Sequence, residues 1–196
     1  MGEDVSDKDR QTADAEVLGR MARSHILAAA TTYRRAAYAS ATALLILALM
    51  ASGGLQGAVS LGWGKLNPAH AAILFNTIAA GLTYLTMYHV FRALRCVADP
   101  AINATSIPAF SRAADLSEDS SSIYIVESGF VRLLVSLFQL GVSFLCVLAL
   151  SVLVTGDPEL AATPTDAQIP LLLGYLAATG LPHALIALSV LLQIFD

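Results

Sequence analysis

The sequence predicts an all-α polytopic membrane protein, with four transmembrane helices arranged as two hairpins and an amphipathic helix ahead of them. Of the 196 residues, 56% are hydrophobic and only 13% are charged, and the mean hydropathy is +0.67. Four apolar blocks reach the roughly 20 residues that a helix needs to cross the hydrocarbon core of a membrane. These blocks lie near Ala36–Leu55, Ala69–Phe91, Phe130–Thr155 and Ile169–Phe195.

The basic residues predict how the four spans are oriented. Ten of the eleven Lys and Arg residues lie before the first apolar block or around the connection between the second and third blocks, and none follows Leu153. Short basic loops remain in the cytoplasm. We therefore expect both termini and the middle loop, about residues 96–126, on the cytoplasmic side, and both hairpin tips on the outside.

Residues 1–35 form a polar segment ahead of the transmembrane domain, which takes up residues 36–196. Within this segment, Ala13–Ala30 has the pattern of an amphipathic helix. Glu16 and Arg20 are four residues apart on the charged side, and Val17 and Leu18 begin the apolar side. The pattern favours a helix on the inner membrane surface, with a solvated helix packed on neighbouring protein as the alternative.

Polar side chains recur on the third block at alternating steps of four and three residues, which places them on one stripe of a helix. The second and fourth blocks carry matching polar groups, so we expect all of them in the interior of the bundle. They form either an interhelical seam, worth about 0.6 kcal/mol per hydrogen bond, or the lining of a hydrated path. The set is Arg132, Ser136, Gln139, Ser143, Cys146, Asn76, Thr83 and Thr179.

Histidines are the residues that would hold a cofactor, because imidazole binds haem iron or a chlorin magnesium. His70, His89 and His183 fall at different depths of their spans, so no pair of them provides two axial ligands at one level. His183 alone, directly after Pro182, is a candidate ligand for a pigment or cofactor. Its alternative role is that of a core histidine bonded to the backbone carbonyl that the proline leaves free. No cofactor is implied, and no metal site is predicted.

The sequence contains no catalytic motif. A Walker loop, a Gly-x-Ser-x-Gly elbow, a zinc-binding helix and Cys-x-x-Cys are all absent from it. No Asp or Glu lies inside any of the four apolar blocks, which argues against a proton or cation pump. No basic surface suited to nucleic acid is present. Cys96 and Cys146 fall at different depths, so we expect two reduced thiols.

Two parts of the chain carry a resemblance to a known family. The first runs from Ala72-Ile73-Leu74-Phe75 to Phe91-Arg92-Ala93-Leu94-Arg95, and the second includes Val131-Arg132-Leu133-Leu134 and the run from Gln139 to Leu148. The chain from the second to the fourth block resembles a family of small bacterial integral membrane proteins of unknown function. The resemblance implies a helical membrane fold and a bacterial inner membrane, and it supplies no activity.

The second to fourth blocks carry polar stripes, but the sequence contains no catalytic motif to accompany them. This combination favours a non-catalytic integral membrane subunit. We expect it to assemble with itself or with other membrane proteins through the stripes on the second to fourth blocks. The alternative is a small homo-oligomeric ion channel or solute carrier lined by the stripe of the third block. A third class is a subunit that carries a cofactor or pigment on His183.

Overall fold

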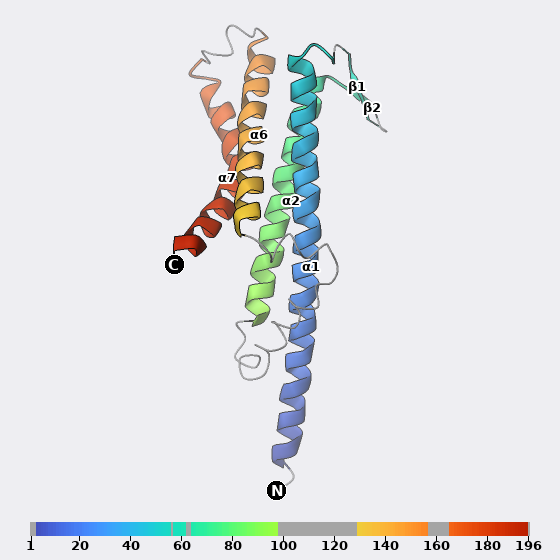
Figure 1. Ribbon diagram of the computed structural model, residues 1–196, viewed down its shortest axis with the longest axis vertical. Coiled ribbons are helices and arrows are strands. Elements are labelled where there is room, and N and C mark those ends of the chain that lie inside the picture. Colours follow the sequence, from blue (N-terminus) through green and yellow to red (C-terminus); the bar gives the residue numbers. More distant parts are fainter. Residues whose placement is uncertain (1–2, 56, 62–63, 98–128, 157–164, 196) are drawn as a thin grey trace. The chain divides into compact units, whose positions relative to one another are not determined.

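The computed structural model describes the backbone of residues 3–55, 57–61, 64–97, 129–156 and 165–195, and the side chains of residues 17–55, 57–60, 64–96, 131–156 and 165–192. Most of the expected middle loop therefore lies outside the described residues. Four helices dominate the fold (Figure 1). They and one strand pair follow in the order α1 Glu3–Ala51, β1 Val59–Leu61, β2 Gly64–Leu66, α2 Pro68–Val97, α6 Gly129–Thr155 and α7 Ile169–Phe195.

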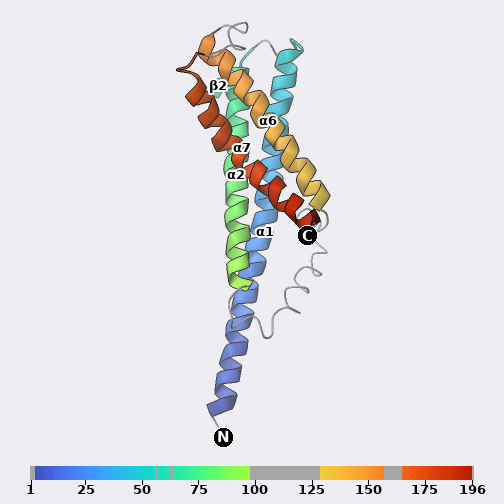
Figure 2. The ribbon, with the colours of Figure 1, turned by 90° about the vertical axis from the view of Figure 1, so that its left-hand side faces the viewer.

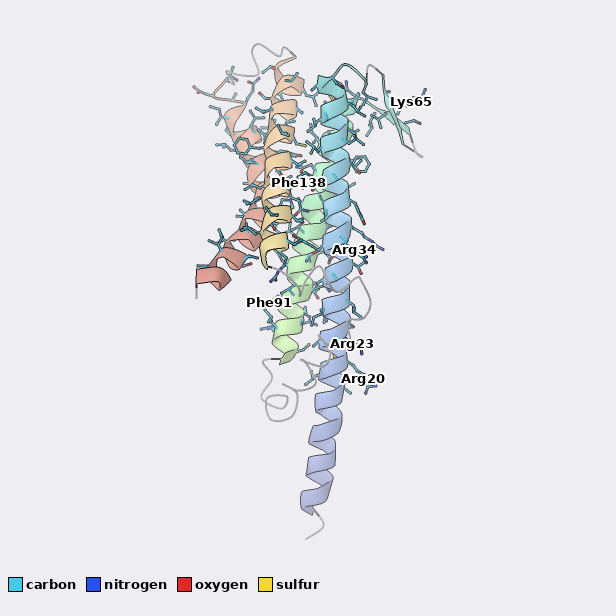
Figure 3. The ribbon with its side chains drawn as sticks, in the orientation of Figure 1. Arg20, Arg23, Arg34, Lys65, Phe91 and Phe138 are labelled. Atoms are coloured by element: carbon cyan, nitrogen blue, oxygen red, sulfur yellow. The ribbon has the colours of Figure 1, made fainter. Side chains whose placement is uncertain are left out.

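Each of the four helices contains a segment that is long and apolar enough to cross a membrane. These segments are Val17–Ala51, Pro68–Cys96, Val131–Thr155 and Ile169–Leu192. The prediction of four apolar helices is thus confirmed by their length and composition. Many large apolar side chains on the four helices are exposed, among them Leu45, Phe138, Phe144 and Leu173. Phe138 is labelled on α6 in Figure 3.

The N-terminal segment differs from the expectation of a separate amphipathic helix. Glu3–Ala51 is a single α-helix of 49 residues, which includes both the polar segment and the first apolar block. The physical reason lies in the sequence, because no Gly or Pro occurs between Arg20 and Ala51 to end or kink the helix. At 1.5 Å per residue the helix is about 73 Å long, roughly twice what the hydrocarbon core requires.

A short β-hairpin joins α1 to α2. Gly53 adopts a positive φ of 72° just after the end of α1, which is the conformation that glycine tolerates best. β1 and β2 then pair antiparallel, with Ser60 opposite Lys65. α2 begins at Pro68, and the Oδ1 of Asn67 accepts a hydrogen bond of 2.9 Å from the backbone N–H of Ala69.

The chain forms two compact units, and α1 and α2 contribute to both. Unit 1 consists of Met1–Tyr33 and Leu85–Ser128. In its described part, the two helices pack through small side chains, since Ala22, Ala29 and Ala93 are buried. The hydroxyls of Thr32 and Thr86 lie 2.8 Å apart across the same seam.

Unit 2 consists of Arg34–Tyr84 and Gly129–Asp196 and contains α6 and α7. α6 and α7 lie side by side and run antiparallel (Figures 1 and 2). Gly180 lets them approach closely, because a Cβ built there would lie 3.2 Å from a Cδ of Leu140. Ile46 of α1 packs on Ala71 and Ala72 of α2, and this contact joins the other two helices of the unit.

Candidate functional site in the interior of unit 2

Asn76 is the centre of a hydrogen-bond network that joins three helices. Its side chain, fully buried on α2, donates from Nδ2 to the hydroxyl of Tyr175 on α7 at 3.0 Å. Its Oδ1 accepts from the hydroxyl of Ser143 on α6 at 3.3 Å. Ser143 also lies 3.4 Å from the backbone carbonyl oxygen of Thr179. The amide of Asn has both a donor, the NH₂ group, and an acceptor, the carbonyl oxygen. Asn76 on α2 therefore bonds to α6 and to α7 at the same time.

The remaining members of the polar set lie around this network. The Sγ of Cys146 is 3.8 Å from the carbonyl oxygen of Ala72, one turn of α6 beyond Ser143. Thr83 and Thr179 are buried, and their hydroxyls donate to carbonyl oxygens of their own helices. Arg132 is half-buried near the start of α6. The structure therefore places the polar side chains between the helices of one chain, with their apolar neighbours outside.

One turn away from the Asn76 network, the interior holds polar side chains without partners. Gln139 precedes Ser143 by four residues, and His183 follows Thr179 by four. Because α6 and α7 are antiparallel and Ser143 touches Thr179, Gln139 and His183 fall at one level of the helix pair. Both are 0% exposed. Neither amide atom of Gln139 and neither ring nitrogen of His183 has a hydrogen-bond partner.

Two buried serines lie near these residues, Ser40 at their level and Ser136 one turn before Gln139 on α6, and we call Ser40, Ser136, Gln139 and His183 the unpaired layer. Ser136 lies three residues before Gln139 on α6, and Ser40 lies three residues before Ala43 on α1. Ala43 packs against Val142 of α6, so Ser40 comes to the level of Gln139. Both serines are fully buried with hydroxyls that have no partner. Sequence reasoning missed Ser40, because a single Ser in an Ala- and Leu-rich block has no periodicity to reveal it.

The unpaired layer is energetically costly as it stands. A buried amide or hydroxyl without a partner costs about 1–3 kcal/mol relative to one that is hydrogen-bonded. Such groups are rare in native proteins, and where they occur they often mark a binding or conformational site. His183 differs from its alternative role as a core histidine, because it has no bond to the carbonyl that Pro182 frees. Gln139, one of the polar residues expected in a seam or along a hydrated path, has no hydrogen bond to another helix.

The structure gives His183 no companion ligand. Among the described residues, no group of three or more His, Cys, Asp or Glu side chains is placed to hold a metal ion. His183 is enclosed by protein, and His70 is exposed near the start of α2. A haem or chlorin on His183 would therefore require the helices around it to separate. Cys96 and Cys146 are both free thiols.

Two further features lie outside the unpaired layer. An open cavity of about 480 Å³ beside the β-hairpin is lined by Met50, Leu55, Gly57, Ala58, Asn67 and Pro68, and none of these side chains is ionisable.

In unit 1, the Nδ1 atoms of His25 and His89 lie 3.1 Å apart. Sequence reasoning missed this pair because it assigned His25 to a separate surface helix. The signal that reveals it is the unbroken helical sequence between residues 20 and 51.

Comparisons of this chain with protein-family models, with curated proteins and with solved structures find no match.

The Asn76 network yields a prediction about stability. Replacing Asn76 with Leu removes the bonds to Ser143 and Tyr175, whose hydroxyls keep only the longer bonds of 3.4 Å to the carbonyl oxygens of Thr179 and Ile73. We therefore expect a loss of about 1–2 kcal/mol in the free energy of unfolding. Unfolding of the purified protein in mixed micelles measures it. The control Thr42→Val removes an exposed hydroxyl that bonds only to its own helix, to the Tyr38 carbonyl, and should change little. Equal effects of the two substitutions would contradict the role given to Asn76.

Proposed function

We propose that this chain is a non-catalytic integral membrane protein whose unpaired layer binds a small, uncharged, hydrogen-bonding solute and passes it across the bilayer. The observation that carries the proposal is the set of buried polar side chains without partners that lie within one turn of each other in the bundle. A solute with donors and acceptors would satisfy these groups and would recover the free energy that their burial costs. This function corresponds to the solute-carrier alternative among the sequence-based expectations.

The distribution of polar and apolar side chains supports a membrane location. Polar groups of α2, α6 and α7 face the interior, while large apolar side chains are exposed. That distribution suits lipid outside and a polar core inside. On this proposal the helices cross the bilayer as two hairpins, with both termini in the cytoplasm. The resemblance of the second to fourth blocks suggests the inner membrane of a bacterium.

The enclosure of the unpaired layer favours a carrier over an open channel. Gln139 and His183 have no solvent-exposed surface, so a solute reaches them only when helices move. α7 has a built-in point for such a movement, because Pro182 lies inside it next to His183 and cannot donate a backbone hydrogen bond. Figure 1 shows α7 changing direction along its length. Alternating exposure of one buried site is how carriers operate.

The chemistry of the unpaired layer favours an uncharged solute. Serine hydroxyls and a glutamine amide have no formal charge, and the described side chains of the four helices include no carboxylate. A path for alkali or alkaline-earth cations would usually be lined by carboxylates or by a ring of backbone carbonyls. An amide, two hydroxyls and an imidazole instead offer both donors and acceptors to a small polyol, an amide or water.

Assembly with a partner is a second candidate function, and a different surface favours it. The polar stripe is buried within the chain and is closed to a partner. On α7, however, Gly174 and Ala178 are exposed and four residues apart, and a Cβ added at Gly174 would meet open space. This spacing of small residues lets a second helix approach closely in a membrane. A homo-oligomer or a larger membrane complex would form through this face.

The proposed transport predicts opposite effects on flux and stability. In Gln139→Leu or His183→Leu, an unpaired polar side chain becomes apolar, so stability should stay unchanged or rise by about 1 kcal/mol. Flux of glycerol or urea into proteoliposomes, followed by light scattering, should be lost in both. The control Thr42→Val changes an exposed polar group and should transport normally. Wild-type liposomes no more permeable than empty ones, or variants with full flux, would refute the proposal.

The proposed orientation predicts which residues an impermeant reagent reaches. In a Cys96→Ser background, a cysteine at Ser60, exposed on β1, should react with an impermeant maleimide added to intact cells. The native Cys96 at the inner end of α2 should react only after the membrane is opened. Labelling in the reverse pattern would show that the termini lie outside.

The assembly candidate predicts that bulk at Gly174 separates subunits. In Gly174→Ile the added side chain would occupy the space that a partner helix needs, and the internal packing of the chain should be unaffected, because that position is open. Crosslinking in native membranes, followed by sizing in mild detergent, measures it. Leu173→Ile, a change of shape at the exposed neighbouring residue, is the control. If the two variants and the wild type migrate alike, this face does not mediate assembly.

A further inference from the structure

His25 of α1 and His89 of α2 meet edge to edge in unit 1, although 64 residues separate them in the chain. Their Nδ1 atoms lie 3.1 Å apart, and the ring centroids are 5.4 Å apart with a tilt of 36° between the planes. Both side chains are half-buried, so each imidazole is partly exposed. Hydrogen bonding explains the contact only when one Nδ1 carries a proton and the other does not.

The position of the pair is fixed by the packing on either side of it. Towards the end of α2, Ala22 and Ala93 are buried between the helices. Towards its start, the Thr32 and Thr86 hydroxyls meet at 2.8 Å. Close contacts on both sides hold the two helix backbones at a set separation. The imidazoles are thus presented to each other by a rigid support, which is what a ligand pair for a metal ion needs.

We propose that His25 and His89 together chelate one divalent transition-metal ion through their Nδ1 atoms. At a metal–nitrogen distance of about 2.05 Å, two ligands of a tetrahedral ion lie about 3.3 Å apart. Two neighbouring ligands of a square-planar ion at the same distance lie about 2.9 Å apart. The separation of 3.1 Å falls between the two geometries. The two nitrogens are therefore already close to the spacing of a chelate, and small ring rotations complete it.

The surroundings select the class of ion. Imidazole is a ligand for Zn²⁺, Cu²⁺ and Ni²⁺, whereas Ca²⁺ and Mg²⁺ require oxygen ligands. The described side chains of unit 1 include no carboxylate, and their charged groups are the exposed Arg20, Arg23, Arg92 and Arg95. Figure 3 shows Arg20 and Arg23 extending from the side of α1 that faces away from α2. Water would fill the remaining coordination positions, so the ion stays exchangeable.

The site is tested with the full chain in detergent, in a Cys96→Ser background that removes the accessible thiol. Titration calorimetry with Zn²⁺ should give one ion per chain, and saturation should raise the melting temperature, because the ion binds only the folded pair. The Cu²⁺-loaded protein should show electron paramagnetic resonance splitting from two nitrogens. Both signals should disappear in His25→Asn and in His89→Asn, since each variant leaves a single imidazole.

The control variant is His70→Asn, which removes an exposed histidine elsewhere on α2 and should keep the one-ion stoichiometry, the thermal shift and the two-nitrogen spectrum. Circular dichroism of the His25 and His89 variants should match that of the wild type, because Asn preserves a polar side chain at a half-exposed position. Absence of Zn²⁺ binding by the wild type would overturn the proposal. So would binding that survives in either variant, or a spectrum with one nitrogen.

Discussion

The interior of unit 2 depends on one buried amide. The side chain of Asn76 bonds to side chains on both of the other polar helices, with Tyr175 on α7 and Ser143 on α6 as its partners. In a bilayer, apolar side chains gain nothing from leaving lipid for protein, so close packing and polar contacts decide which helices associate. This constraint explains why the residues around Asn76 are small, and why Ala72, Ala79 and Ala80 are buried nearly completely. Larger residues would move the three helices beyond hydrogen-bond distance.

The next turn of the bundle, at Gln139 and His183, is unusual because its polar side chains are closely packed but have no hydrogen-bond partners. At Asn76 the helices are near enough for bonds of 3.0 and 3.3 Å. One turn further, Gln139 and His183 are enclosed but unpaired. A protein selected only for stability would have apolar residues there, since a Leu fills similar space without the cost of desolvation. Stability alone therefore does not account for the four polar side chains of the unpaired layer, whereas the proposed solute site would, and Pro182 next to His183 is a weak point of α7.

Much of the architecture follows from the sequence. The length of the apolar blocks predicts the four helices, and the steps of four and three residues place Ser136, Gln139, Ser143 and Cys146 on one face, which is the face that the structure buries. Periodicity does not say which polar groups meet. Asn76 and Gln139 look alike in a sequence, but Asn76 lies opposite a Ser and a Tyr, while Gln139 lies where no partner reaches it. The difference depends on helix register and separation, and neither has a local signal.

The contact between His25 and His89 shows the same limit of prediction from sequence. Depth along a span is a sound guide to which residues meet only when the start of each helix is known. If residues 13–30 formed a separate helix, His25 would not be part of the span that pairs with α2, and His89 would have no histidine opposite it. Once α1 is continuous, it pairs antiparallel with α2, so that Thr32 meets Thr86. His25, seven residues earlier on α1, then lies close enough for its side chain to contact His89, three residues later on α2. The pairing follows from the absence of a helix breaker. The absence of Gly and Pro between Arg20 and Ala51 therefore contributes to this contact as much as the two histidines do.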